Sequence, residues 1–370
     1  MTGGGTGGHV NPALAIAEII KTNQPNSEIA FVGTEKGIEN KLVPKAGYKL
    51  YHINIQGIRR SLSPSNIKTA YLVLTSPRAA KRIIKEFKPD IVIGTGGYVC
   101  WPLLKAASDM GIPSMVHESN AIAGVAVKQL KNKVDVIMTN FASTADSLGA
   151  KAKTVRVGNP INAGFGRLSK SEARRILGIP ESVRTVVLSC GGSLGASRVN
   201  EAALELMENF SAKDKDVFHY HAFGRIGAGN MPEELRKRSL DKCENLRVSE
   251  YIYDMPAVMS AADVVICRAG AMTLSEIASM RKAAVIIPSP NVTDNHQYKN
   301  AKVLADAGAA VLVEESELAS RPLSAEVRRL AESAELRAAM EEKIAEFASD
   351  DAGKAIYREI CALTSEKKSK

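Results

Sequence analysis

The sequence predicts an α/β protein built from two units, each with a parallel sheet covered by helices on both faces. Three observations support this prediction. Short apolar runs alternate with helical patterns along the whole chain, the second half repeats the plan of the first, and glycine-rich turns follow several of the runs. Parallel neighbouring strands need crossover connections of about a dozen residues, which helices supply. A length of 370 residues gives each unit enough chain for its own core.

The predicted strands set the order of the elements. In the first half we expect strands near residues 29–32, 50–53, 91–93, 114–117, 134–138 and 154–157. In the second half we expect them near residues 185–190, 217–223, 246–248, 264–267, 284–288 and 310–313. A linker at roughly 158–168 separates a first domain, residues 1–160, from a second domain, residues 161–345. Residues 346–370 then form a final helix and a tail that is frayed from residue 364 onward.

Composition is typical of a soluble globular protein, with 24% charged and 45% hydrophobic residues. No run reaches the ~18–20 apolar residues of a membrane-spanning helix, and no signal peptide opens the chain. The five cysteines are scattered and never form Cys-x-x-Cys. This pattern argues against a disulfide framework or a zinc site and fits a reducing cytosol.

The net charge of +9 is unevenly distributed along the chain. Residues 1–160 contain 20 Lys and Arg against 10 Asp and Glu, whereas the remainder contains 29 against 30. The excess positive charge therefore belongs to the first half, which predicts an anionic partner for that half, either nucleic acid or an anionic membrane. No nucleic-acid-binding motif is present and aromatic residues are few, so the membrane is favoured.

Residues 57–88 carry the most suggestive surface of the first half, because basic and apolar residues are interleaved there. A basic rim around apolar side chains suits docking on anionic lipid. The alternative is an amphipathic core helix with a solvated basic face. The residues predicted to contact the membrane are Ile67, Leu72, Arg78, Lys81, Arg82 and Lys85.

The opening stretch, residues 3–12, is a glycine-rich turn that leads into a helix. We expect Asn11 to cap this helix and Pro12 to take its first position. Glycines let the backbone approach a ligand, and a helix N-terminus favours an anion, so a phosphate or sugar is expected here. The alternative is a tight turn without a ligand. Only Met1 and Thr2 precede the turn, so the first strand of the sheet is expected to be missing, which would loosen the turn.

The spacing of glycines in the opening stretch, at positions 3, 5 and 8, also satisfies the dinucleotide-binding pattern, with Glu35 as the acidic residue after the next strand. Two further glycine turns, residues 94–98 and 191–196, follow predicted strands and precede helices. Both could hold phosphate groups. Three such turns in two sheets favour an anionic ligand over packing alone.

Several polar residues stand where parallel strands end. Arg268 follows a buried run and could neutralise phosphate. Glu276 could grip ribose hydroxyls, or it could belong to a capping box with Thr273. The same alternative holds for Gln297 and Asp294.

His9 is the histidine that lies inside a glycine turn, and a side chain with a pKa near 6.5 is a natural general base for a hydroxyl. His117 ends a predicted strand and faces the same cleft.

Seven ordered motifs are together identified as those of the MurG family of bacterial N-acetylglucosaminyltransferases. They are Gly-Gly-Thr-Gly-Gly-His-Val-Asn-Pro-Ala-Leu-Ala, Gly-Thr-Gly-Gly-Tyr, His-Glu-Ser-Asn, Gly-Asn-Pro-Ile, Gly-Gly-Ser-Leu-Gly-Ala, Cys-Arg-Ala-Gly-Ala-Met-Thr-Leu-Ser-Glu and Asp-Asn-His-Gln-Tyr-Lys-Asn-Ala. The resemblance extends from about residue 2 to about residue 360.

The resemblance implies a GT-B fold, in which two Rossmann-like domains face each other across a cleft and the final helix crosses back to the first domain. It implies an inverting, metal-independent enzyme without a cofactor. Such an enzyme moves N-acetylglucosamine from UDP-N-acetylglucosamine to the 4-hydroxyl of undecaprenyl-diphospho-N-acetylmuramoyl-pentapeptide (lipid I), which gives lipid II. It also implies a peripheral protein on the cytoplasmic face of the membrane, with the cell-wall and division machinery as candidate partners.

The resemblance also implies roles for individual residues. His9 is the expected catalytic base. The acceptor is expected to contact Thr6, His9, Gly96, Gly97 and Tyr98. The donor is expected to contact Thr6, Gly7, Gly8, Asn120, Ser193, Gly195, Ile252, Arg268, Ala271, Met272, Thr273, Glu276 and Gln297. Many relatives carry Arg where this chain has Asn162, and Arg167 is the candidate substitute.

Three other functions remain open from the residues themselves. The opening glycines alone would fit an NAD-dependent oxidoreductase. A UDP-sugar epimerase could share the fold, and a lipid- or UDP-sugar-binding protein without turnover is the alternative outside the enzymes.

Overall fold

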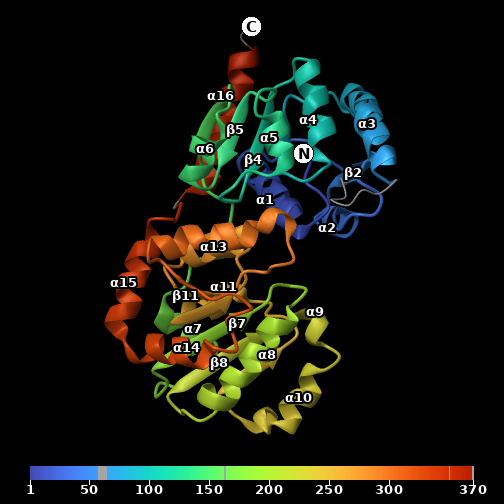
Figure 1. The fold of residues 1–370 in the computed structure, drawn as a ribbon. Coiled ribbons are helices and arrows are strands. Elements are labelled where there is room, and N and C mark those ends of the chain that lie inside the picture. Colours follow the sequence, from blue (N-terminus) through green and yellow to red (C-terminus); the bar gives the residue numbers. More distant parts are fainter. Residues whose placement is uncertain (57–64, 162–163, 350, 369–370) are drawn as a thin grey trace. The chain divides into compact units, whose positions relative to one another are not determined.

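The computed structural model describes residues 1–56, 65–161, 164–349 and 351–368 (Figure 1). The chain divides into two compact units. The first consists of Met1–Ile161 together with Ser349–Lys370, and the second of Asn162–Ala348. The sequence placed the boundaries at 160/161 and 345/346. Asn162, at the position where the resemblance led us to expect arginine, lies outside the described residues.

The first unit contains a parallel sheet in two hydrogen-bonded parts, β2-β1 and β3-β4-β5-β6. Its strands are β1 (Ala30–Gly33), β2 (Lys49–His52), β3 (Val92–Gly94), β4 (Ser114–Glu118), β5 (Val136–Thr139) and β6 (Lys153–Arg156). Because the strands of each part run parallel, their carboxyl ends lie at one edge, where ligands of such sheets bind.

Met1 and Thr2 occupy the position between β1 and β3. Thr2 forms parallel bridges with both Val32 and Gly94. Its N–H donates to the Ile93 carbonyl at 2.9 Å, and the Val32 N–H donates to the Met1 carbonyl at 2.9 Å. The described residues before the opening turn form no regular strand, as expected. Two paired residues nevertheless hold the start of the turn in the sheet, which argues against the expected loosening.

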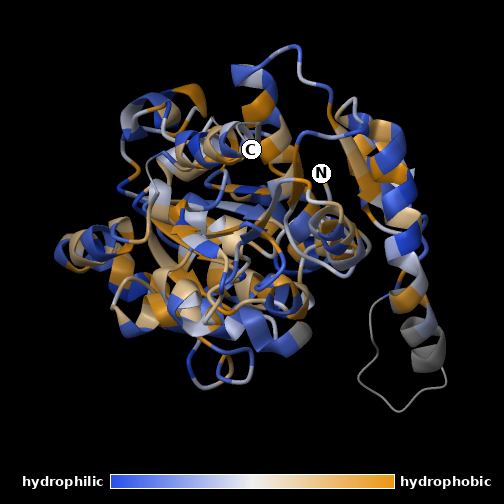
Figure 2. Cartoon of the chain, turned by 90° about the horizontal axis from the view of Figure 1, so that it is seen from above, coloured by the Kyte–Doolittle hydropathy of each residue, from blue (hydrophilic) through white to orange (hydrophobic). Residues whose placement is uncertain are grey.

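Helices cover both faces of the first sheet. They are α1 (Gly7–Asn23), α2 (Glu39–Lys45), α3 (Ser65–Phe87), α4 (Cys100–Asp109), α5 (Val125–Leu130), α6 (Ala142–Leu148) and α16 (Ala352–Lys368). Ile16 of α1 and Ile356 of α16 pack with alternate strand residues such as Met115 on one face. Ile84 of α3 and Leu104 of α4 pack on the other face of the sheet, against strand residues such as Val116. Figure 2 shows hydrophobic colour along the strands inside these layers.

Helix α16 belongs to the first unit although it ends the described chain. Ile356, Ile360 and Leu363 are buried in the same core cluster as Ile16 and Ile93. The expected return of the final helix to the first domain is therefore observed. The helix begins at Ala352 rather than near 346 and continues to Lys368, so residues 364–368 are helical rather than frayed.

Helix α1 begins earlier than the sequence predicted. Asn11 and Pro12 were expected at its start, but Thr6 is its N-cap and Gly7 its first residue. The Thr6 carbonyl accepts hydrogen bonds from the N–H groups of His9 (3.1 Å) and Val10 (3.2 Å), so the glycines form the first turn. Pro12 lies inside the helix, where its missing N–H removes one bond. His9 consequently lies in the first helical turn.

The second unit contains a parallel sheet in the order β12-β11-β10-β7-β8-β9. The strands are β7 (Thr185–Cys190), β8 (Val217–Ala222), β9 (Leu246–Ser249), β10 (Val264–Cys267), β11 (Ala283–Ile286) and β12 (Val311–Leu312). The helices are α7 (Lys170–Ile176), α8 (Ser197–Leu206), the π-helix η1 (Met207–Ser211), α9 (Gly224–Gly227), α10 (Met231–Lys237), η2 (Leu240–Lys242), α11 (Met255–Ala261), α12 (Ala271–Ser279), η3 (Thr293–Asn295), α13 (His296–Asp306), α14 (Leu323–Glu332) and α15 (Ala334–Ala345).

Candidate active site

The candidate residues of the first unit gather where the paired Thr2, β3 and β4 end. The opening turn leaves Thr2, residues 95–98 follow β3, and Asn120 follows β4. These chain segments are neighbours in the parallel sheet, so their carboxyl ends meet at one edge.

His9 is half-buried and has a fixed ring orientation. Its Nδ1 lies 3.1 Å from the Thr95 carbonyl oxygen. A carbonyl oxygen can only accept, so Nδ1 must carry the proton in this hydrogen bond. In the neutral ring Nε2 then holds the lone pair, which is the form a general base requires. Thr95, which the sequence analysis did not single out, therefore sets the tautomer of His9.

The two glycine turns of the first unit are packed against each other. A Cβ on Gly96 would lie 2.7 Å from Nδ1 of His9, and one on Gly97 would lie 2.4 Å from the Gly4 carbonyl oxygen. A Cβ on Gly5 would lie 2.9 Å from the Tyr98 ring. Gly96 and Gly97 also have φ values of +98° and +83°, which favour glycine.

Gly7 and Gly8 differ from the glycines that precede them. A Cβ on either would meet nothing closer than 3.7 Å. No side chain caps the start of α1, because Thr6 forms no capping hydrogen bond. The open part of the opening turn is therefore its second half, at the N-terminus of α1.

Glu39 lies beneath the opening turn. The sequence pattern pointed instead to Glu35 as the acidic residue that follows the strand. Glu35 is exposed, whereas Glu39 is buried. Oε2 of Glu39 accepts a hydrogen bond from the Gly5 N–H at 3.1 Å. The only signal in the sequence is that Glu39 precedes the buried Val43 by four residues, which places both on the inner face of α2.

Asn120 is held at the end of β4 by the buried carboxylate of Glu118. Oε1 of Glu118 accepts from the backbone N–H and the side-chain amide of Asn120, both at 3.0 Å. His117 is fully buried, and its Nε2 lies 2.8 Å from the Gly158 carbonyl oxygen. Burial lowers the pKa of His117, so this histidine is a structural residue of the strand.

The glycine turn of the second unit follows β7 and is more open. Ser193 is exposed, and a Cβ on Gly192 would meet nothing within 4 Å. Gly195 is packed, since a Cβ there would lie 2.1 Å from the Phe223 carbonyl oxygen. This turn therefore presents Gly192 and Ser193 to solvent beside the N-terminus of α8.

Glu276 lies inside α12 and not at its cap. The helix begins at Ala271 after Gly270, no side chain caps it, and Met272 and Thr273 occupy its first turn. The capping-box interpretation of Thr273 and Glu276 is therefore wrong. Burial raises the pKa of Glu276 to about 7, so this carboxyl group is poised to respond to a ligand near neutral pH.

Arg268 and Gln297 both contact the segment that follows β11. Arg268 donates from one nitrogen to the carbonyls of Ile287 (3.1 Å) and Pro288 (3.2 Å), and from another to Glu315. Oε1 of Gln297 accepts from the Ser289 N–H at 2.9 Å. Helix α13 has Asn295 as its N-cap without a side-chain bond, so Asp294 and Gln297 form no capping box either.

Ile252 lies in the segment after β9 and is 8% exposed, whereas Tyr253 beside it is 93% exposed. Three predicted donor residues, Ser193, Ile252 and Arg268, follow β7, β9 and β10 of the same parallel sheet. Glu276 lies in the helix that follows β10. The second unit thus brings its predicted donor residues to one edge of its sheet.

The predicted membrane residues lie on α3 and divide into two stripes. Leu72 is buried, as are Ser76, Ala80 and Ile84 at intervals of four residues. The prediction that Leu72 contacts lipid is therefore wrong, because its stripe packs inward. The outer stripe combines exposed apolar and basic residues. It consists of Tyr71, Leu74, Arg78, Arg82 and Lys85.

Two predicted residues of α3 stand apart from the outer stripe. Lys81 forms an ion pair with Asp109 at 3.2 Å. The Ile67 side chain lies outside the described residues. In Figure 2, α3 alternates between hydrophilic and hydrophobic colour along its length.

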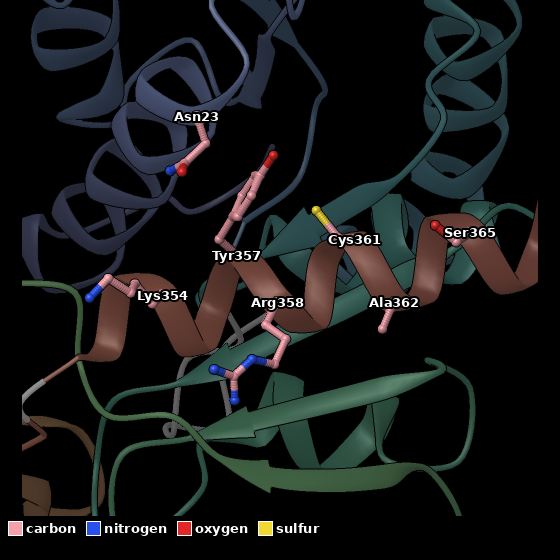
Figure 3. Close-up of a pocket in the computed structure, with 7 residues that line it drawn as sticks. All are labelled: Asn23, Lys354, Tyr357, Arg358, Cys361, Ala362 and Ser365. Atoms are coloured by element: carbon pink, nitrogen blue, oxygen red, sulfur yellow. The ribbon is translucent and has the colours of Figure 1, made fainter.

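Two hollows among the described residues of the first unit lie away from the candidate site. A shallow hollow of about 560 Å³ is lined by Asn23 and residues of α16 that point to different sides of the helix (Figure 3). A cavity of about 360 Å³ is lined by residues such as Ile29, Phe87 and Ile360. No candidate residue lines either one.

No described helix is both long and apolar enough to span a membrane. Within the described ranges, no group of three or more His, Cys, Asp and Glu side chains could hold a metal ion.

Comparison with protein families agrees with this geometry. Residues 1–139 match the glycosyltransferase family 28 N-terminal domain, and residues 186–356 match the glycosyltransferase family 28 C-terminal domain. The first match lies within the first unit and covers β1 to β5. The second covers most of the second unit and extends into α16 of the first.

Individual relatives show to which branch of this glycosyltransferase family the chain belongs. A protein of Thermoanaerobacter sp. (strain X514), named UDP-N-acetylglucosamine–N-acetylmuramyl-(pentapeptide) pyrophosphoryl-undecaprenol N-acetylglucosamine transferase, is 39% identical over 98% of this chain and 99% of its own length. The crystal structure of MurG from Acinetobacter baumannii is 31% identical, with a TM-score of 0.77 and 96% of each chain covered. A UDP-N-acetylglucosamine 2-epimerase structure is 14% identical over 94% of this chain and 91% of that one, with a TM-score of 0.63, and shares the fold alone. The chain is therefore a GT-B hexosyltransferase that belongs to glycosyltransferase family 28 and, within it, to the MurG family.

Proposed function

We propose that the protein transfers N-acetylglucosamine from UDP-N-acetylglucosamine to the 4-hydroxyl of the muramoyl sugar in lipid I, which gives lipid II and UDP. The observation that carries this proposal is the likeness to N-acetylglucosamine transferases over the full chain, at 39% identity. The epimerase alternative is supported only by a shared fold at 14% identity. Neither an oxidoreductase nor a protein without turnover accounts for the matches of both domains to a glycosyltransferase family.

In the proposed reaction His9 is the catalytic base. Nε2 removes the proton from the 4-hydroxyl as that oxygen forms a bond to the anomeric carbon of the donor sugar. The bond between that carbon and the diphosphate oxygen breaks on the opposite side, so the configuration inverts and UDP leaves with the electron pair. The Thr95 carbonyl stabilises the imidazolium that forms, because it accepts from Nδ1.

The acceptor is proposed to bind beside His9, at the N-terminus of α1, where the helix dipole favours the acceptor's diphosphate. Thr6, Gly96, Gly97 and Tyr98 border this point and shape the acceptor site.

The donor is proposed to bind the second unit. Gly192 and Ser193 leave room for its diphosphate at the N-terminus of α8. Glu276 accepts hydrogen bonds from the ribose hydroxyls, and Ile252 lies against the uracil ring. Ala271, Met272, Thr273, Gly195, Arg268 and Gln297 surround the same edge of the sheet. The family resemblance adds Asn120, Thr6, Gly7 and Gly8 to the residues proposed to contact the donor.

The outer stripe of α3 is proposed to bind an anionic membrane surface, which would place the protein on the cytoplasmic face where the lipid-linked acceptor is available. Tyr71 is 65% exposed and Leu74 is 74% exposed, beside the exposed cations Arg78, Arg82 and Lys85. Each cation near anionic lipid contributes about 1 kcal/mol. The cell-wall and division machinery are proposed as further partners.

A vesicle experiment tests the membrane proposal. Changing Arg78, Arg82 and Lys85 together to Gln should reduce cosedimentation with phosphatidylglycerol vesicles by about a hundredfold in affinity. Lys81→Gln is the matched control on the same helix and should have a smaller effect, because Lys81 is paired with Asp109. Equal binding by the triple variant and the unaltered protein would refute the proposal.

A transfer assay tests the function itself. The protein is incubated with a lipid I analogue and UDP-N-acetylglucosamine, and the disaccharide product and UDP are measured together. Equal amounts of both support the transfer. UDP without disaccharide would indicate hydrolysis, and N-acetylmannosamine products would indicate epimerisation. Adding EDTA should leave the transfer rate unchanged. A transfer rate that falls with EDTA and returns when Mg²⁺ is added would contradict the proposed metal-independent reaction.

A further inference from the structure

Glu39 is a buried carboxylate that the opening turn encloses. It is the first residue of α2 and only 1% exposed. Oε2 accepts from the Gly5 N–H at 3.1 Å. Oε1 accepts from the Thr34 N–H at 2.9 Å and from its hydroxyl at 3.0 Å. The carboxylate thus joins the end of β1 to the opening turn.

These donors keep the carboxylate ionised. Burial opposes the charge, but the hydrogen bonds from Thr34 and Gly5 outweigh it and lower the pKa of Glu39. Hydrogen bonds to an ionised acceptor are stronger than neutral ones, so Gly5 is firmly held.

Three glycines leave the space that Glu39 occupies. A Cβ on Gly37 would lie 2.0 Å from Oε2, one on Gly33 would lie 2.6 Å from Cγ, and one on Gly4 would lie 2.9 Å from Oε1. Part of the glycine pattern in this region therefore accommodates a carboxylate of the protein itself rather than a ligand.

Glu39 is linked to His9 through its hydrogen bond to Gly5 and the backbone that follows Gly5. Gly5 precedes Thr6, whose carbonyl accepts the N–H groups of His9 and Val10 and so starts α1. On the other side, the Thr95 hydroxyl donates to the His9 carbonyl at 2.6 Å, and the Thr95 carbonyl lies 3.1 Å from Nδ1. The first turn of α1 is therefore fixed from two sides.

From this geometry we infer that Glu39 is a positioning residue for the transfer reaction, which anchors Gly5 so that the first turn of α1 presents His9 to the acceptor hydroxyl. The inference rests on the proposed role of His9.

The test is Glu39→Gln, which keeps the side-chain volume but replaces one oxygen by an NH₂ group that cannot accept from Gly5 or Thr34. A misplaced base lowers the rate sharply, so kcat/KM for the lipid I analogue should fall about tenfold. The Kd for UDP-N-acetylglucosamine, measured by calorimetry, should stay within about twofold because the proposed donor site lies mainly in the other unit. Glu35→Gln, an exposed carboxylate between β1 and α2, should behave like the unaltered protein.

A double variant separates positioning from stability. If Glu39 acts through His9, Glu39→Gln should reduce the residual rate of His9→Ala by less than about twofold, although it costs about tenfold alone. A shifted apparent pKa in the pH dependence of kcat/KM is expected for the single variant. Unchanged kcat/KM in Glu39→Gln, or full additivity with His9→Ala, would overturn the inference.

Two further results keep the test decisive. If Glu39→Gln fails to fold, Thr34→Val is used instead, because it removes one donor from Oε1 of Glu39. Thr34→Val should lower kcat/KM in the same way but to a smaller degree. An unchanged kcat/KM in Thr34→Val would overturn the inference. If His9→Ala alone has normal turnover, the proposed base is wrong irrespective of the result for Glu39.

Discussion

The two units use glycine turns at the same place in similar sheets, but the turns differ in what surrounds them. In the first unit, Gly4, Gly5 and Gly96 are packed against side chains of the protein itself, namely Glu39, Tyr98 and His9. In the second unit, Gly192 has nothing within 4 Å and Ser193 is exposed. A glycine pattern therefore does not by itself identify a phosphate site. Gly4, Gly5 and Gly96 of the first unit make room for side chains of the protein, whereas Gly192 of the second unit leaves space that a ligand can occupy.

The largest expected effect comes from a pair of matched glycine substitutions. Gly96 and Gly192 have similar φ values, +98° and +88°, so alanine is strained at both. Only at Gly96 would the new Cβ approach His9, at 2.7 Å from Nδ1. Gly96→Ala should therefore lower kcat about a hundredfold. Gly192→Ala should leave kcat within a few-fold and change mainly the Kd for UDP-N-acetylglucosamine. Steady-state kinetics measures kcat and calorimetry measures the Kd for each variant. Equal losses of kcat in Gly96→Ala and Gly192→Ala would contradict the proposed difference between the two turns.

A smaller effect is expected from the carboxyl group of the second unit. Burial raises the pKa of Glu276 to about 7, and its ionised form is the better acceptor for ribose hydroxyls. Affinity for UDP-N-acetylglucosamine should therefore weaken up to about tenfold between pH 8 and pH 6, as the group takes up a proton. The diphosphate diester of this ligand does not titrate in that range. Glu276→Gln should bind about tenfold more weakly at pH 8, with no pH dependence. The same pH dependence in wild type and Glu276→Gln would exclude this group.

The histidines of the two units extend the comparison to stability. His9 is half-buried, whereas His219 and His221 are fully buried and share the Ser189 hydroxyl, at 2.8 and 2.7 Å. Burial lowers the pKa of His219 to about 3 and that of His221 to about 4. The unfolded chain takes up these protons near pH 6.5, so their contribution to stability is complete above that pH and is lost as the pH falls towards 4.

Urea unfolding measures this loss. Below pH 6.5 the free energy of unfolding should fall by up to about 1.4 kcal/mol per pH unit for each buried histidine. His52 is exposed, so His52→Gln should leave the pH dependence unchanged. Urea unfolding midpoints that stay constant between pH 7 and pH 5 would contradict the lowered pKa values of the buried histidines.

The sequence predicted the strands well because buried parallel strands are short apolar runs. β7 and β10 have the predicted bounds, and the others differ by two residues or fewer. The start of α1 was predicted too late because a run of glycines is typical of a loop, and the bonds to the Thr6 carbonyl form only in the folded turn.

The site residues missed by sequence analysis depend on contacts between distant segments. Glu39 contacts Gly5 across 34 positions, and Thr95 contacts His9 across 86. Glu35 and Glu39 follow the same strand, and the spacing of four residues between Glu39 and Val43 is the local sign that Glu39 turns inward. Leu72 was misassigned because apolar residues stand on both faces of α3, and only packing shows which stripe is buried.

The most direct test of the account measures His9→Ala in two experiments on the same preparation. Single-turnover transfer to a lipid I analogue reports the chemistry, and calorimetry with UDP-N-acetylglucosamine reports donor binding. The account predicts a transfer rate at least about tenfold lower, because the general base is lost, with donor affinity retained. A normal transfer rate would show that His9 is not the base and that the packed turn of the first unit serves another purpose.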